Sequence, residues 1–324
     1  MEHLPVMFAE VLQQLAIKKD GIYLDCTFGR GGHSQGILSL LDSTGRLLAF
    51  DRDVDAVNSG YAQSMLEDKR FKLKHSCFSE LENIAVSEDL AGKVDGILMD
   101  LGVSSPQLDN PERGFSFLRD GPLDMRMDGN SGVTAEQWLA NVDEKELVKV
   151  LFEYGEERFA RRIAHAITEK RVESPITTTR ELARLIEDAV PIREKHKHPA
   201  TRSFQAIRIE INSELDELRA VLQQSARILK PGGRLVVISF HSLEDRIVKR
   251  FIRSESGAKY NPGKLPIKEI DIAKGILKKT GKALKAGQQE IAQNVRARSA
   301  VMRVAERVSV IAPCVALPPV SIPS

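Results

Sequence analysis

Short apolar runs, separated by stretches long enough for a helix, recur along this chain. They cover residues 22–26, 47–51, 71–75, 94–100 and 234–240. Strands of this length alternating with helices predict an α/β fold in which a mostly parallel sheet carries helices on both faces. Ligands of such sheets bind along the edge where the strands end. Asp25, Asp51 and Asp100, which lie at or one residue before the ends of three runs, therefore mark the expected site.

A glycine-rich loop follows the first run. It reads Gly29-Arg30-Gly31-Gly32-His33, and Asp51 lies about 20 residues beyond Gly31. At this spacing an acid on the second strand reaches the ribose hydroxyls of an adenosine held over the loop. Glycine allows a backbone to approach a ligand closely because it has no Cβ. The unit predicts a cofactor that contains adenosine.

Two residues bear on which cofactor this is. A dinucleotide site favours a third glycine in the loop, and Ser34 stands at that position. Asp25 would receive a pyrophosphate poorly, whereas its charge suits the ammonium group of S-adenosylmethionine. We therefore predict S-adenosylmethionine, with a nicotinamide cofactor or an ordinary strand-to-helix turn as the alternatives.

The fourth and fifth runs are separated by far more chain than one crossover needs. Apolar residues at helical spacing predict helices over 135–141, 144–152, 156–170 and 179–190. We predict an inserted helical domain at 110–198 and a discontinuous catalytic domain at 1–109 and 199–324. A helix over 212–229 should pack on the sheet, and the Lys/Gly-rich stretch 257–286 is predicted to be a loop.

The charge is unevenly distributed. The chain has a net charge of +2, yet residues 246–307 hold 16 Lys and Arg against 5 Asp and Glu. This predicts a polyanionic partner, with a solvated lysine-rich face as the alternative. No apolar stretch is long enough to span a membrane, so we predict no membrane partner. The 3 cysteines lack metal spacing and predict free thiols in a cytoplasmic protein.

Several longer motifs occur together in this chain. They are DCTFGRGGH (25–33), DLGVSSPQ (100–107), RGFSF (113–117), GPLDMRMD (121–128), YGEERF (154–159), HPATRSFQA (198–206) and SFHSLEDR (239–246). As a set they resemble the MraW family of small-subunit ribosomal RNA methyltransferases, over residues 3–307. The resemblance implies a Rossmann-like, S-adenosylmethionine-dependent methyltransferase. Its implied substrate is the exocyclic N4 of a cytidine in the decoding region of 16S ribosomal RNA, at position 1402 in the usual numbering.

The resemblance also implies which residues bind the cofactor. They are Gly31, Gly32, His33, Asp51, Phe78, Asp100 and Gln107. Asp51 would accept from both ribose hydroxyls, and Phe78 would lie against the adenine. A backbone N–H of His33, at the start of the first helix, would meet the methionine carboxylate. A helix cap at the end of the strand is the alternative role for Asp51, and the glycine loop before it disfavours that role. Without the resemblance, Phe78 would more often belong to the core.

The segment after the fourth strand is the expected place of the chemistry. The N4 lone pair of cytosine is delocalised into the ring, so catalysis needs acceptors that hold the amino hydrogens and align the nitrogen with the methyl group. Asp100, Ser104 and Ser105 are the candidates, and the catalytic residue stays open. Methyl transfer from a sulfonium needs no metal.

Two other functions remain as alternatives. DNA amino methyltransferases carry a Pro-Pro-aromatic tetrapeptide after this strand, and its absence argues against methylation of DNA. A ribosome-assembly factor with a vestigial cofactor pocket is the other alternative. The intact set of Gly31, Asp51 and Asp100 argues against that one.

Candidates for RNA contact lie outside the cofactor motifs. We predict Trp138, His198, Arg202, Ser203 and His241. Trp138 could stack on the target cytidine, although a tryptophan is more often part of the hydrophobic core. The cations of 193–202 suit phosphate, with a solvated hinge loop as the alternative. The implied partner is 16S ribosomal RNA in the small subunit, and we hypothesise a homodimer.

Overall fold

A mostly parallel sheet forms the centre of the computed structural model, which describes residues 5–192, 198–257 and 275–309. Its strand order is β3-β2-β1-β4-β5-β8-β6, with β7 also paired to β8. The parallel strands are β1 (Ile22–Asp25), β2 (Arg46–Asp51), β3 (Phe71–His75), β4 (Val94–Asp100) and β5 (Leu229–Ser239). This doubly wound order confirms the predicted Rossmann-like α/β fold.

The edge of the sheet beyond β5 is antiparallel. β8 (Val301–Arg307) runs antiparallel to β5, and β6 (Leu277–Lys279) and β7 (Leu284–Lys285) both pair with its outer side. The predicted loop over 257–286 is therefore wrong for these two strands. They are too short to show an alternating pattern, and pairing with β8 is what makes them strands.

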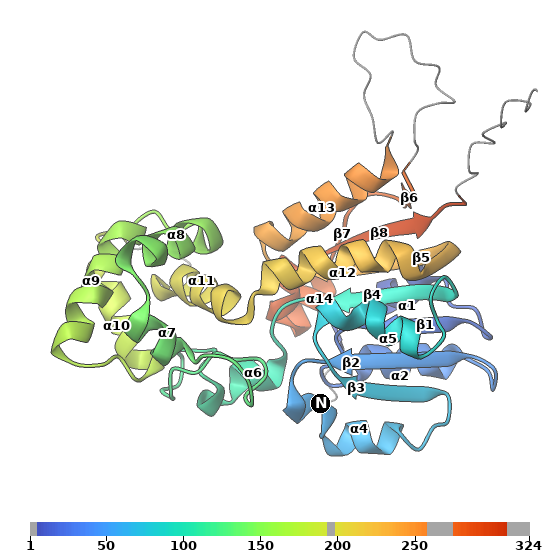
Figure 1. Cartoon of the computed structure of the whole chain (residues 1–324), viewed down its shortest axis with the longest axis horizontal. Coiled ribbons are helices and arrows are strands. Elements are labelled where there is room, and N and C mark those ends of the chain that lie inside the picture. The colour runs from blue at the N-terminus through green and yellow to red at the C-terminus, as the bar shows by residue number, and fades with distance from the viewer. Residues whose placement is uncertain (1–4, 193–197, 258–274, 310–324) are drawn as a thin grey trace, which may run out of the picture.

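Helices cover both faces of the sheet (Figure 1). Alternate strand residues serve the two faces, so Leu24 and Phe50 join one hydrophobic core and Tyr23 and Ala49 the other. The first core is covered by α5 (Leu81–Ser87), α12 (Glu214–Ile228) and α13 (Ser242–Ser256). The second is covered by α1 (Phe8–Leu15), α2 (Gly32–Leu40) and α4 (Gly60–Met65).

A separate helical unit stands beside the edge where the parallel strands end (Figure 1). It consists of α7 (Ala135–Asn141), α8 (Glu144–Gly155), α9 (Ala160–Glu173), α10 (Thr179–Ala189) and α11 (Ala200–Asn212), which share a third core. The four predicted helices are present as α7, α8, α9 and α10, and the bounds of α7 agree with the predicted ones. The domain boundaries stay predictions, and the packing of α11 favours an end of the unit after residue 212 instead of 198.

Short elements connect the unit to the sheet. After β4 the chain forms α6 (Ser105–Asp109) and the 3-10 turn η2 (Pro111–Arg113), and it returns through α11 into α12. In the described ranges, no helix has both the length and the apolar content to cross a membrane.

Candidate active site

Three carboxylates meet where neighbouring strands end. Asp25, Asp51 and Asp100 are the last residues of β1, β2 and β4, and β1 lies between the other two strands. This confirms the predicted arrangement along one edge of the sheet. The loop between β1 and α2 lies over the same edge.

Asp25 is hydrogen-bonded to the start of this loop and to the first turn of α2. Its side chain is fully buried; Oδ2 accepts from the Ser34 hydroxyl at 2.7 Å and Oδ1 from the Thr27 amide at 3.1 Å. Burial raises the pKa of Asp25, and the Ser34 hydrogen bond opposes that rise. Ser34, at the position where a dinucleotide site has glycine, thus supplies a hydrogen bond to Asp25. The structure does not support a direct contact between Asp25 and a cationic ligand.

The loop glycines are required by the protein's own packing. Gly31, at the N-terminus of α2, has φ +75°, and a Cβ there would lie 2.8 Å from the rings of Phe28 and Tyr61. A Cβ on Gly32 would collide with the Pro5 ring. The collisions that the structure reveals are with side chains, so close approach of a ligand to these glycines stays a prediction.

Asp51 is tied to the same loop. Its Oδ2 accepts from the Gly29 amide at 2.7 Å and its Oδ1 from the Asp53 amide at 2.8 Å. Each carboxylate oxygen still has a lone pair that can accept another hydrogen. Burial raises the pKa of Asp51 to about 6. The geometry suits an acceptor for two hydroxyls as long as the group is ionised.

Asp100 and His33 present unsatisfied polar atoms at this edge. The Asp100 amide donates to the Thr27 hydroxyl at 2.7 Å, which joins β4 to the loop. Asp100 Oδ2 lies 3.5 Å from His33 Nε2, while its buried Oδ1 makes no hydrogen bond with any described residue. Both ring nitrogens of His33 are buried and equally lack a hydrogen bond within the described ranges. Buried polar atoms without partners indicate a place for a ligand, so these residues fit the expected cofactor.

Gln107 and Ser104 shape the following turn. Gln107 Oε1 accepts from the Ser104 amide at 2.8 Å, and its Nε2 donates to Asp53 Oδ2 at 2.7 Å. The amide of Gln107 therefore orients the loop in this conformation, and cofactor contact stays a prediction. Ser105, the first residue of α6, is partly buried. Phe78 opens the 3-10 turn η1 (Phe78–Glu80) just after β3 and packs partly against the first core.

Asp53 and Arg113 form part of the site that the sequence predictions missed. Arg113 donates to Asp53 and to Asp55, both at 2.9 Å, and also to the Met127 carbonyl at 2.8 Å. It joins the loop after β2 to the base of the helical unit. Arg113 opens the RGFSF motif, and that motif was the one signal in the sequence that could have found it.

Two RNA candidates line a small cavity on the helical unit. His198 and Arg202 border a space of about 90 Å³ beside α11. The His198 ring lies 4.6 Å from that of Phe117, and its Nδ1 accepts from the Ala200 amide at 3.2 Å. Residues 193–197 of the predicted basic stretch lie outside the described residues.

Ser203 and Trp138 are more closely tied to the helical core. Ser203 is fully buried, so we withdraw it as an RNA contact. It lies on the inner face of α11, which the helical pattern alone did not reveal. Trp138 is partly buried and packs on the same core, and its role in RNA binding stays a prediction.

His241 lies on the catalytic side, immediately before α13. Its Nε2 is 3.1 Å from Glu244 Oε1, and Glu244 Oε2 accepts from the Phe240 amide at 2.8 Å. Glu214, His241 and Glu244 bring ligand-type atoms within 4.8 Å of one another. Arg208, however, donates to both oxygens of Glu214 at 2.8 and 2.9 Å. Its charge disfavours a cation there.

Comparison with known proteins assigns the chain to a family. The model of the MraW methylase family matches residues 1–308. The chain belongs to this family. Ribosomal RNA small subunit methyltransferase H of Pseudoalteromonas atlantica is 56% identical over 306 residues, which are 94% of this chain and 98% of that protein. The protein of the same name from Methylococcus capsulatus is 56% identical over 301 residues, 93% of this chain and 99% of its own.

Solved structures resemble the chain more distantly. NSun6 from Pyrococcus horikoshii is 15% identical, with a TM-score of 0.42, and the match covers 94% of this chain and 53% of that one. The fold assignment rests on the sheet topology of the chain itself. Membership of a methylase family with this fold confirms S-adenosylmethionine as the cofactor of this MraW family member.

Proposed function

We propose that this MraW family member methylates the exocyclic N4 of cytidine 1402 in 16S ribosomal RNA. The names of relatives that match it over nearly the whole chain support ribosomal RNA of the small subunit as the substrate. The structural observation that supports the chemistry is the buried Oδ1 of Asp100 at the end of β4, which has no hydrogen-bond partner among the described residues. The assembled subunit as substrate, the cytoplasmic location and the homodimer stay predictions.

The residues proposed to hold the cofactor surround the carboxyl ends of β1 to β4. Asp51 would accept from the ribose hydroxyls, and the amides at the start of α2, from Gly32 and His33, would meet the methionine carboxylate. Phe78 would lie against the adenine. Gly31 shapes the loop, Asp100 lies beside His33, and Gln107 orients the turn. When bound, S-adenosylmethionine supplies a methyl group on a positively charged sulfur.

Asp100 is the proposed acceptor for the target amine. The N4 nitrogen of cytosine shares its lone pair with the ring, so it attacks only when its hydrogens are held out of the ring plane. A carboxylate oxygen with no other partner can accept one of these hydrogens. As the nitrogen–carbon bond forms and the sulfur–carbon bond breaks, one N4 proton must leave. Asp100 is the group that we assign to receive it, and Ser104 and Ser105 remain secondary candidates.

Mass-spectrometric mapping of modified nucleosides tests the function. Small-subunit RNA from cells with and without the protein should differ by one methyl group on N4 of this cytidine. Purified protein should restore the group when it is given S-adenosylmethionine and the unmodified RNA. Transfer to DNA alone, or RNA binding without any transfer, would contradict the proposal and favour one of the two alternative functions.

Replacing Asp100 by Asn tests the proposed acceptor. At saturating cofactor, single-turnover methyl transfer should fall by about 10²-fold or more, since the amide cannot take up the N4 proton. Asp89→Asn, on an exposed turn, serves as the control and should leave the rate unchanged. Because Asp100 also lies in the predicted cofactor site, binding of S-adenosylmethionine is measured separately. A normal rate in Asp100→Asn would remove Asp100 from the chemistry.

A further inference from the structure

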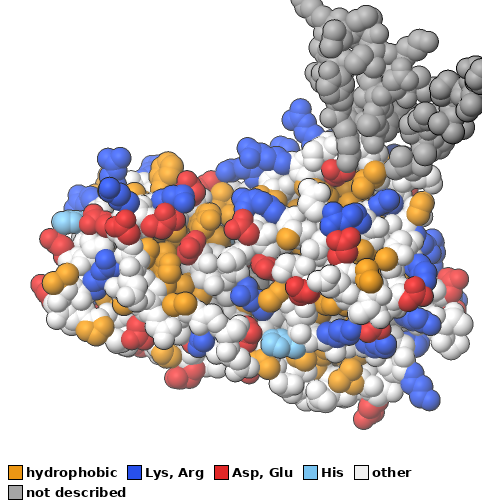
Figure 2. All heavy atoms as spheres, in the orientation of Figure 1, with side chains coloured by type: hydrophobic (Ala, Val, Ile, Leu, Met, Phe, Trp, Pro, Cys, Tyr) orange, Lys and Arg blue, Asp and Glu red, His pale blue; other side chains and the backbone are white. Residues whose placement is uncertain are grey.

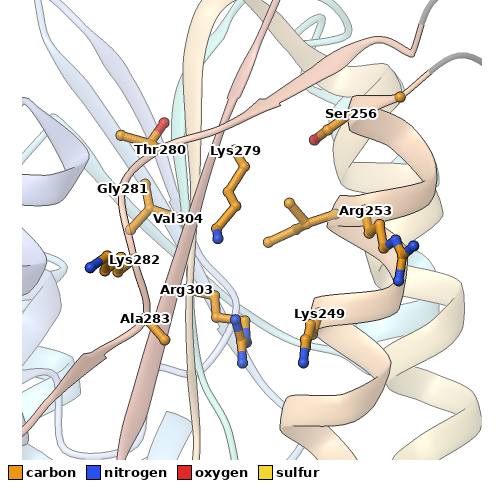
Figure 3. Close-up of a pocket in the computed structure, with 12 residues that line it drawn as sticks. Lys249, Arg253, Ser256, Lys279, Thr280, Gly281, Lys282, Ala283, Arg303 and Val304 are labelled. Atoms are coloured by element: carbon orange, nitrogen blue, oxygen red, sulfur yellow. The ribbon is translucent and has the colours of Figure 1, made fainter.

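A basic groove lies on the outer edge of the sheet, away from the candidate active site. It has a volume of about 360 Å³ and runs between the C-terminal half of α13 and residues 279–283, beside β8. Five of its described lining residues are cations, namely Lys249, Arg253, Lys279, Lys282 and Arg303, and Ile252 and Val304 add apolar surface. Figure 3 shows Lys279 extending between the strands and α13 toward the ends of Arg303 and Lys249, whereas Lys282 points away.

The cations of this groove are poorly neutralised. Arg303 pairs with Asp245 at 2.6 and 2.9 Å. Lys249, Arg253 and Lys279 form no ion pair with a carboxylate of the described ranges, and no Asp or Glu of those ranges lines the groove. Figure 2 shows Lys and Arg side chains gathered over the region of α13. Gathering like charges costs free energy, which an anionic ligand would recover.

The lining favours phosphate over bases as the ligand. No aromatic side chain among the described residues lines the groove, so these residues offer bases no surface on which to stack. Lysine and arginine around a narrow space suit phosphodiester oxygens, which position a nucleic acid without reading its sequence. An acidic protein surface is the other class of partner, and the ribosomal RNA substrate that we propose makes the phosphate backbone the better candidate.

The groove is too far from the reaction centre to hold the target base. Asp100 on β4 is the register partner of Ile238 on β5, which is itself the partner of Met302 on β8. Lys279 on β6 is the partner of Ala305, three residues further along β8. Three steps between neighbouring strands and three residues along β8 separate the Cα atoms of Asp100 and Lys279 by roughly 18 Å. We propose that the groove binds the phosphodiester backbone of the RNA substrate several nucleotides from the methylated cytidine. This inference rests on the proposed function.

The test compares two variants with equal loss of charge. The groove variant carries Lys249→Gln, Arg253→Gln and Lys279→Gln. The control variant carries Lys19→Gln, Arg46→Gln and Lys69→Gln, three exposed cations near the opposite ends of β1 to β3. Both are titrated with a protein-free transcript of the 16S decoding region between about 50 and 200 mM salt. Binding of S-adenosylmethionine shows whether each variant keeps its fold.

The groove variant should bind the transcript more weakly than the control variant. The slope of log affinity against log salt should fall by about 2 to 3, since each lost phosphate contact removes about 0.7 to 0.9. Equal slopes for the two variants on the protein-free transcript overturn the inference. If the slopes are equal and only the groove variant loses affinity for the assembled subunit, the groove binds a protein of that subunit instead. Absence of methyl transfer by the wild-type protein contradicts the proposed function instead, whatever the slopes.

Discussion

Asp51 links cofactor binding to pH. Burial raises its pKa from 3.8 to about 6, so the carboxyl takes up a proton just below neutral pH. A protonated carboxyl donates from one oxygen and can no longer accept from two hydroxyls. Affinity for S-adenosylmethionine should therefore be constant above about pH 7 and fall by up to about tenfold per pH unit below pH 6. Calorimetric titration between pH 5 and pH 8 measures this.

The matched variant is Asp51→Asn. The amide does not titrate, so its affinity should be lower at pH 8 and lack the step near pH 6. If both proteins show the same pH profile, another group controls binding. Unchanged affinity at pH 8 would remove Asp51 from the proposed ribose site.

At the scale of elements, Asn212 fixes the end of α11. Its buried side chain donates to the carbonyls of Met125 and Arg208, at 2.8 and 2.9 Å, and accepts from the Met127 amide at 2.7 Å. Asn212→Ala leaves these groups unsatisfied and should lower the free energy of unfolding by about 2–4 kcal/mol. Asn83→Ala, which removes one exposed hydrogen bond to Glu80, should cost less than about 0.5 kcal/mol. Denaturant unfolding measures both, and equal effects would contradict this role.

At the scale of the whole molecule, Arg113 joins the sheet to the helical unit. It pairs with the buried Asp53 beside β2 and donates to carbonyls in the segment that leads into α7. Arg113→Met leaves Asp53 without its cation and should cost about 3–5 kcal/mol. Because the two cores lose this connection, we expect calorimetry to show two unfolding transitions. Arg126→Met is the control, since Arg126 pairs with Asp124 in its own segment; a single transition in both variants would contradict the coupling.

Local sequence determined most of the elements. Apolar runs that end in Asp located β1, β2 and β4, and helical periodicity placed α7 and α10 within one residue of their observed ends. The family motifs located the cofactor edge. These features depend on residues close together in the chain, so a pattern of period two or 3.6 is enough to reveal them.

Tertiary structure decided how those residues are used. β6 and β7 exist because β8 pairs with them, and Ser203 is buried because α11 turns that face to the helical core. Asp25 lies at the expected strand end, but its side chain is buried and accepts hydrogen bonds from Ser34 and Thr27. The brace between Arg113 and Asp53, like the basic groove, joins segments distant in sequence. The sequence determined which residues reach the sheet edge, while burial and long-range contacts decided which of them remain free to bind a ligand.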